Sequence, residues 1–262
     1  MSQTNAGYDP VYFAPLAAAE DRHFWFKTRN QIIAAAAQPA VRQLATGYRV
    51  LEVGCGTGNV LRSLAGLPGA GLVAGMDLYR DGLRFANQRC NCPLVQADLR
   101  QPPFGAPFHL VGMFDVLEHL EDDHGVLEML KKLILPGGWL LLTVPASRRL
   151  WSVFDEAGGH VRRYERDDLH ALLVGAGFQV EYLTYTMLTL YLPVWLARRT
   201  ANLRRPAGVV DPQALHEEAL DEIRIIPVIN EIAAASMAWE VGAIRRRKQL
   251  PFGTSLIALA KI

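Results

Sequence analysis

Residues 50–61 read VLEVGCGTGNVL, an apolar run that leads through a glycine-rich segment into a stretch with helical spacing. The glycines therefore occupy a strand-to-helix turn, where the missing side chains let the backbone approach a ligand closely. A dinucleotide fingerprint places its third glycine at position 59, but Asn59 stands there and the third glycine is Gly58. This spacing disfavours NAD as the ligand.

Short apolar runs on both sides of this turn have the length of strands and alternate with stretches of helical spacing. Such alternation predicts an α/β fold with a parallel, doubly wound sheet. The predicted strands cover residues 49–53, 72–77, 94–97, 109–114, 139–144, 178–185 and 254–260.

The stretches between the strands carry helix signals. Apolar residues from Val126 to Ile134 repeat at helical spacing, and Pro136-Gly137-Gly138 is expected to stop that helix. Asp167 is expected to cap a further helix that runs to about Val174, with Gly175 and Gly177 ending it.

We expect one domain over residues 1–262. Residues 1–47 form an N-terminal helical cap, residues 48–185 and 251–262 form the ligand-binding core, and residues 186–250 form a helical lid inserted before the last strand. Prolines at 193, 206, 212 and 227 are expected to punctuate the lid.

Two acidic residues follow the next strands in order. Asp77 ends the second strand, where its carboxylate can accept hydrogen bonds from both hydroxyls of a ribose. Asp98 follows the third strand. One aspartate after a strand is usually a turn or cap residue, but three features in the expected order predict one nucleoside site.

This pattern resembles the class I S-adenosylmethionine-dependent methyltransferases, in particular bacterial small-molecule enzymes of the type 11 and type 12 groups. The resemblance implies a Rossmann-like, seven-stranded, mostly parallel sheet with an antiparallel last strand. It also implies that S-adenosylmethionine binds, that Asp77 holds its ribose and that Asp98 accepts from its adenine amino group. The remaining cofactor contacts implied by the resemblance are Glu52, Gly54, Cys55, Gly56, Gly58, Leu78, Leu99 and Phe114.

Residues 23–30, HFWFKTRN, resemble a segment that covers the cofactor in several small-molecule methyltransferases. Arg29 could meet the methionine carboxylate as a bidentate ion pair. The alternative is a surface charge beside an aromatic cluster, and we expect Trp25 and Phe26 to belong to the core.

Residues 115–123, DVLEHLEDD, follow the fourth strand and resemble the corresponding segment of ubiquinone-pathway O-methyltransferases. Transferred residue by residue, the resemblance implies Asp115, Glu118 and His119 as ligands of a divalent cation. Because Leu-Glu-His also occurs in family members without a metal, we expect no metal here. We expect His119 and Asp115 to line the pocket as candidate bases.

Residues 151–164, WSVFDEAGGHVRRY, follow the fifth strand, and Gly158-Gly159 allows the loop to fold over a ligand. A similar GHxRRY segment recurs in bacterial small-molecule methyltransferases. His160 is a further candidate base, and Arg163 is a candidate anion clamp. The alternative is a polar loop whose arginines pair with nearby acidic residues. The predicted substrate contacts are Trp151, Arg163 and Tyr164.

The charge balance favours a small-molecule partner. The chain has 27 Lys and Arg against 26 Asp and Glu, so no global field favours nucleic acid or an acidic membrane. Residues 188–205 combine apolar side chains with two Arg pairs, which leaves a peripheral membrane contact as a disfavoured alternative. The oligomeric state stays open.

Cysteine usage favours a reducing cytoplasm, because Cys55, Cys90 and Cys92 are few and odd in number. No charged segment followed by an apolar one opens the chain, and the apolar run 187–197 is shorter than the roughly 20 residues of a membrane-spanning helix. Cys90 and Cys92 are expected to pack rather than to bind a metal. The basic run 245–248 is expected at a solvated helix end.

We therefore expect methyl transfer from S-adenosylmethionine to a small organic acceptor, with oxygen favoured over nitrogen or carbon. A lipid- or sugar-linked acceptor is a variant of this hypothesis. Aminopropyl transfer would need an acidic cleft, which the Arg-rich loop opposes. A catalytically silent S-adenosylmethionine-binding protein is the non-enzymatic alternative.

Overall fold

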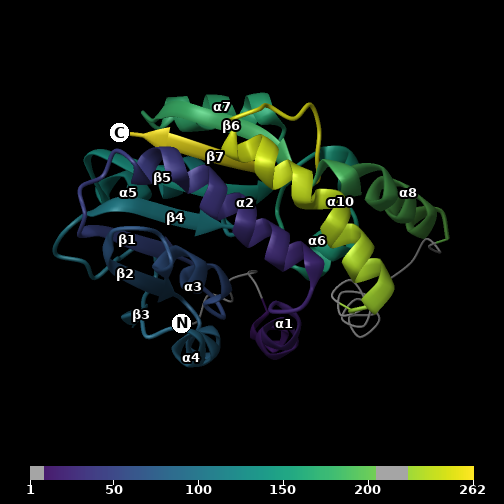
Figure 1. Cartoon of the computed structure of the whole chain (residues 1–262), viewed down its shortest axis with the longest axis horizontal. Helices are drawn as coiled ribbons and strands as arrows, with labels where there is room; N and C mark the ends of the chain where they lie inside the picture. The colour runs from purple at the N-terminus through teal and green to yellow at the C-terminus, as the bar shows by residue number, and fades with distance from the viewer. Residues whose placement is uncertain (1–8, 205–223) are drawn as a thin grey trace.

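The computed structural model describes residues 9–204 and 224–262, and seven strands of these residues form one sheet. The strand order is β3-β2-β1-β4-β5-β7-β6 (Figure 1). β7 is antiparallel to both of its neighbours, and the other pairings are parallel. This arrangement confirms the predicted fold class. The strands are β1 (Tyr48–Val53), β2 (Ala70–Asp77), β3 (Leu94–Gln96), β4 (Phe108–Phe114), β5 (Ile134–Pro145), β6 (Gln179–Thr186) and β7 (Ser255–Lys261).

Helices cover both faces of the sheet because each central strand is apolar on both sides. Val50 and Leu110 belong to one core cluster, which contains side chains of α2, α3 and α10, whereas Leu51 and Val111 belong to the other, which contains side chains of α5 and α7. The helices are η1 (Pro10–Tyr12), α1 (Phe13–Ala19), α2 (Phe24–Val41), α3 (Asn59–Ala65), α4 (Arg80–Arg89), η2 (Leu117–His119), α5 (Asp123–Lys132), η3 (Arg148–Leu150), α6 (Val153–Ala157), α7 (Arg166–Gly175), α8 (Leu188–Arg204) and α10 (Pro227–Arg245).

The site position follows from the strand order. The chain moves outward from β1 to β2 and β3, then returns to the other side of β1 with β4 and β5. The loops after β1 and β4 therefore diverge at the carboxyl edge of the sheet, where open α/β sheets bind ligands.

Two predicted helix boundaries were wrong. Pro136-Gly137-Gly138 does not stop a helix, because α5 ends at Lys132 and these residues already belong to β5. Gly137 N donates to Ile262 O and Ile262 N donates to Gly138 O, so the backbone of this segment pairs with the residue that follows β7. Asp167 lies in the first turn of α7, and Glu165 occupies the N-cap position without a side-chain cap bond.

The segment predicted as a lid contains α8 and α10, and residues 205–223, with Pro206 and Pro212, lie outside the described residues. Pro193 lies inside α8 rather than at a boundary, whereas Pro227 opens α10 as expected. Figure 1 shows α10 alongside α2, so α10 packs along this helix of the N-terminal segment.

Side chains of α10 hold the neighbouring elements in place. Asn230 Oδ1 accepts from Phe24 N at 2.7 Å, at the start of α2. Glu240 is fully buried and accepts from Leu188 N, Thr189 N and Thr189 Oγ1 at 2.7–3.1 Å. A carboxylate of α10 therefore caps the first turn of α8.

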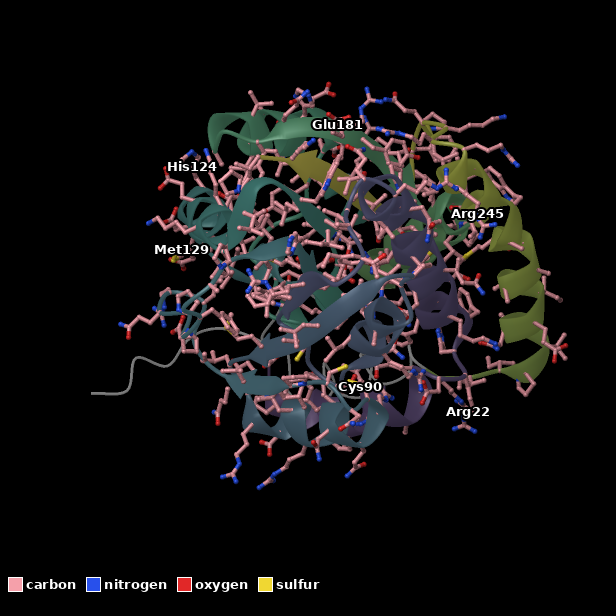
Figure 2. The ribbon with its side chains drawn as sticks, turned by 60° about the vertical axis from the view of Figure 1, so that its left-hand side comes forward. Arg22, Cys90, His124, Met129, Glu181 and Arg245 are labelled. Atoms are coloured by element: carbon pink, nitrogen blue, oxygen red, sulfur yellow. The ribbon has the colours of Figure 1, made fainter. Side chains whose placement is uncertain are left out.

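Two smaller expectations, on the packing of the cysteines and on the basic run at a helix end, are confirmed. Cys90 and Cys92 pack against the core cluster beside α2 and α3, and all three cysteines are free thiols. The basic run begins at Arg245, the last residue of α10, whose exposed side chain is labelled in Figure 2. Within residues 9–204 and 224–262, no helix combines the length and apolarity that a membrane crossing requires.

We expect Glu240→Ala to lower the free energy of unfolding by about 1–3 kcal/mol, because three donors at the start of α8 lose a charged acceptor. Urea denaturation measures this loss. Glu231→Ala on the exposed part of α10 is the control, with an expected change within about 0.5 kcal/mol. Equal stability of the two variants would contradict the capping role.

Candidate functional site

The glycine turn between β1 and α3 depends on left-handed backbone. Gly54, Gly56 and Gly58 have φ values of 73°, 48° and 77°. A Cβ at Gly54 would lie 2.4 Å from Val116 Cγ2, and one at Gly58 would lie 2.8 Å from the Ala86 Cα. Conformation and crowding therefore both require glycine at Gly54 and Gly58.

Two buried carboxylates flank this turn. Asp77 Oδ2 accepts from Gly56 N at 2.7 Å and Asp77 Oδ1 accepts from Tyr79 N at 2.8 Å, and burial raises the pKa of Asp77. Each carboxylate oxygen retains a second lone pair for a ligand. Glu52 is buried, and its Oε2 has no hydrogen-bond partner among the described residues. Burial raises the pKa of Glu52 well above its usual value.

Asp98 lies farther out and is paired with Arg100. The Arg100 Nε lies 3.0 Å from each carboxylate oxygen of Asp98, and these hydrogen bonds lower the pKa of Asp98.

One cavity of about 1210 Å³ connects these groups to the loops after β4 and β5. Most of the sequence-predicted site residues line it. They are Arg29, Glu52, Gly54, Cys55, Gly56, Asp77, Leu78, Asp98, Leu99, Phe114, Asp115, Glu118, His119, His160 and Arg163.

Three sequence-predicted residues do not line this cavity. Gly58 packs against Ala86. The Trp151 Nε1 donates to a Glu156 carboxylate at 3.4 Å, and the buried Tyr164 donates to Asp123 Oδ2 at 3.1 Å.

Several lining residues were missed by the sequence argument. As expected, Phe26 is buried and Trp25 packs against the core cluster, but both rings also line the cavity. From α8, Leu190, Val194 and Arg198 line it as well. No local sequence signal marks the α8 residues, because their position depends on how α8 docks on the sheet.

Arg29 and Asp115 form an ion pair across the cavity wall, with Arg29 Nη1 3.0 Å from Asp115 Oδ2. The guanidinium also lies 4.9 Å from the centre of the Trp25 ring. Asp115 has a left-handed backbone with φ 54°, and its Oδ1 accepts from Thr143 Oγ1 at 3.1 Å. Such a conformation costs about 1–3 kcal/mol and is concentrated at functional sites.

The loop after β5 places His160 against a buried aspartate. Asp155 Oδ1 lies 2.9 Å from His160 Nδ1 and 2.7 Å from Arg163 Nε. Burial alone would raise the pKa of Asp155, but the hydrogen bond with His160 and the guanidiniums of Arg163 and Arg198 lower it below its usual value. Asp155 is therefore a carboxylate anion that orients the His160 ring.

His119 and Glu118 lie beside His160. The His119 and His160 rings meet edge to face, with 4.8 Å between their centres, and His119 Nδ1 is 3.3 Å from Gly159 O. Burial, and after it the neighbouring His160, lowers the pKa of His119 to about 4. Burial also raises the pKa of Glu118 well above its usual value.

The sheet order, the glycine turn and the acidic residues at the carboxyl ends of β1 and β2 define a class I S-adenosylmethionine-dependent methyltransferase fold. A family model described as a methyltransferase domain matches residues 18–183, and the chain belongs to that family.

Curated relatives match only part of the chain. The ubiquinone biosynthesis O-methyltransferase of Paraburkholderia phymatum is 34% identical over 105 residues, which are 37% of this chain and 44% of that protein. The match therefore covers less than half of the relative's length.

Solved structures match over most of the chain. One belongs to the complex that contains the Haloferax volcanii Trm112 methyltransferase activator, with a TM-score of 0.59, 17% identity and coverage of 96% of this chain and 94% of that chain. The [4+2]-cyclase SpnF has a TM-score of 0.55 and 15% identity, covering 90% of this chain and 82% of its own. These similarities establish the fold, and the cyclase illustrates that one fold supports different reactions.

Gly58→Ala should lower the free energy of unfolding by about 1–3 kcal/mol more than Gly47→Ala. Both positions have positive φ, but a Cβ at Gly47 meets no atom within 4 Å, whereas one at Gly58 meets the backbone of Ala86. Urea denaturation of the two variants isolates the steric cost. Equal free energies of unfolding would show that α4 can shift to make room for the Cβ at position 58 without loss of stability.

Proposed function

We propose that the protein transfers a methyl group from S-adenosylmethionine to an oxygen atom of a small organic acceptor. The observation that carries this proposal is the single cavity that joins the glycine turn, Glu52 and Asp77 to His119 and His160. Such a cavity can hold the cofactor and the acceptor next to each other. In an in-line displacement, most of the catalysis comes from aligning the two reacting groups and removing water from them.

The residues at the first end of the cavity fit S-adenosylmethionine. The buried Glu52 oxygen that has no hydrogen-bond partner among the described residues suits the cationic methionine amino group. We assign the ribose to Asp77 and the adenine amino group to Asp98. Arg29 would hold the methionine carboxylate, exchanging or sharing its ion pair with Asp115.

Apolar and backbone contacts complete the proposed cofactor site. Leu78, Leu99 and Phe114 line the same cavity, as do Gly54, Cys55 and Gly56 of the turn. Gly58 contributes through the shape of the turn, since its position is needed for the packing of α3 against α4.

The acceptor end lies at the loops after β4 and β5. His119, His160 and Asp115 are the candidate proton acceptors, and His160 is the best oriented because Asp155 holds its Nδ1. We assign substrate contact to Arg163. Trp151 and Tyr164 would act on the substrate only through the shape of the loop, because neither lines the cavity.

When bound, S-adenosylmethionine would supply an electrophilic methyl group to the acceptor oxygen, with the sulfur leaving as a neutral thioether, and His160 or His119 would take up the hydroxyl proton. Oxygen is favoured because the acceptor end holds two imidazoles that can take up that proton. The curated relative is itself named as an O-methyltransferase, which supports the same choice.

Asp77→Ala is expected to weaken S-adenosylmethionine binding by about 10²–10⁴-fold, because two charged hydrogen bonds of about 1.5–3 kcal/mol each are lost. Isothermal titration calorimetry measures the affinity. Asp77→Asn retains an acceptor for the turn and should show an intermediate loss, and Asp81→Ala at the exposed start of α4 is the control. Unchanged affinity in Asp77→Ala, or a preference for NAD(H), would refute the cofactor assignment.

His160→Ala should lower kcat by about 10²–10⁴-fold with unchanged S-adenosylmethionine affinity. The assay follows transfer of a labelled methyl group to pooled small metabolites, then to the acceptor isolated from them. His119→Ala is expected to behave alike, and the exposed His124→Ala is the control. Full activity in both His160→Ala and His119→Ala would place the proton acceptor elsewhere, and absence of any transfer would favour a silent binder.

A further inference from the structure

Glu118 is the most unusual carboxylate in the cavity. It lies in η2 directly after β4 and is 0% exposed. Neither of its carboxylate oxygens has a hydrogen-bond partner within the described residues. A buried carboxylate in that condition carries a large desolvation cost, so its position needs a compensating partner.

The neighbouring carboxylates already have cationic partners. Asp115 pairs with Arg29, and Asp155 pairs with Arg163. The guanidinium of Arg163 also donates to Ala146 O. The closest charged or titratable contact given for Glu118 is His160 Nε2, which lies 3.8 Å from Glu118 Oε1.

Two histidines converge on Glu118. One ligand atom from each of Glu118, His119 and His160 lies within 4.8 Å of the other two. His160 Nδ1 is held by Asp155 Oδ1 at 2.9 Å, which directs Nε2 to the Glu118 side of the ring. A carboxylate on the far nitrogen is the usual outer partner of a metal-binding histidine.

We propose that Glu118, His119 and His160 bind one divalent transition-metal ion of the Zn²⁺ type. Two imidazoles and one carboxylate favour such an ion over Mg²⁺ or Ca²⁺, which prefer oxygen ligands. Three protein ligands leave one position of a four-coordinate site open to the cavity. Closing the ligand atoms around an ion requires movements of about 1 Å, since they lie up to 4.8 Å apart.

This ligand set differs from the set that sequence resemblance implied. Asp115 is replaced by His160, because Asp115 is engaged by Arg29 and Thr143. His160 comes from the loop after β5, 42 positions beyond Glu118 in the chain, so only the folded structure brings it to the site.

The ion would add to the proposed function. A role of the ion in the reaction rests on the proposed methyl transfer, but binding of the ion to these three residues does not. The open position would hold the acceptor oxygen, and a hydroxyl bound there loses its proton to water more readily. His160 would then act as a ligand in place of accepting the proton.

Co²⁺ titration of the untagged, full-length chain tests the proposal, because bound Co²⁺ reports its ligands through visible d–d absorption. The wild-type chain should bind one equivalent with a tetrahedral-type spectrum. Glu118→Gln and His160→Gln should each weaken binding at least about 100-fold, more than the loss of an outer partner would. His124→Ala on α5, shown at the outer edge of the molecule in Figure 2, should bind like the wild type.

Asp115→Asn separates the two ligand sets and should change Co²⁺ affinity less than about tenfold. Circular dichroism and thermal unfolding identify folded variants, and His160→Gln serves if Glu118→Gln does not fold. The proposal is overturned if the wild type binds no single equivalent, if binding survives in both Gln variants, or if Asp115→Asn loses binding that His160→Gln keeps. Ion binding without methyl transfer would instead refute only the proposed function.

Discussion

The left-handed glycine turn after β1 is the constraint on which the site depends. Gly54 leaves room for Val116 of the loop after β4, and Gly58 leaves room for Ala86 of α4. The turn therefore lies in van der Waals contact with both α4 and the loop after β4, because glycine places no side chain between them. Asp77 Oδ2 then accepts from Gly56 N, so the carboxyl ends of β1 and β2 are held together by a buried charged hydrogen bond.

Charge pairing explains the rest of the carboxyl edge. A buried anion is costly unless it is paired. Glu240 and the partly buried Asp115 find donors on elements distant in sequence, whereas the buried Asp155 pairs with Arg163, 8 positions away. Glu118 is fully buried without a hydrogen bond in the described part of the chain. The cation that we propose between Glu118, His119 and His160 would compensate for this burial.

The helices outside the sheet determine what the cavity can accept. α10 packs along α2 and caps α8 through Glu240, and α8 in turn contributes Leu190, Val194 and Arg198 to the wall. The N-terminal segment contributes aromatic rings and Arg29. The cavity wall therefore combines side chains of the N-terminal segment and of α8 with the loops of the central sheet.

The α/β fold and the glycine turn with Asp77 were predictable from sequence, because apolar periodicity and glycine spacing are local properties. The strands were predicted as well, but β5 begins at Ile134 rather than at residue 139. The sequence argument placed a helix end at residues 136–138. In the structure Gly137 and Gly138 belong to β5 and pair with Ile262, more than 100 positions away. Only the tertiary structure decided that Arg29 pairs with Asp115 and that His160 reaches Glu118. The physical reason is that a partner for a buried charge is chosen by proximity in the fold, and separations of 86 and 42 positions leave no trace in local sequence.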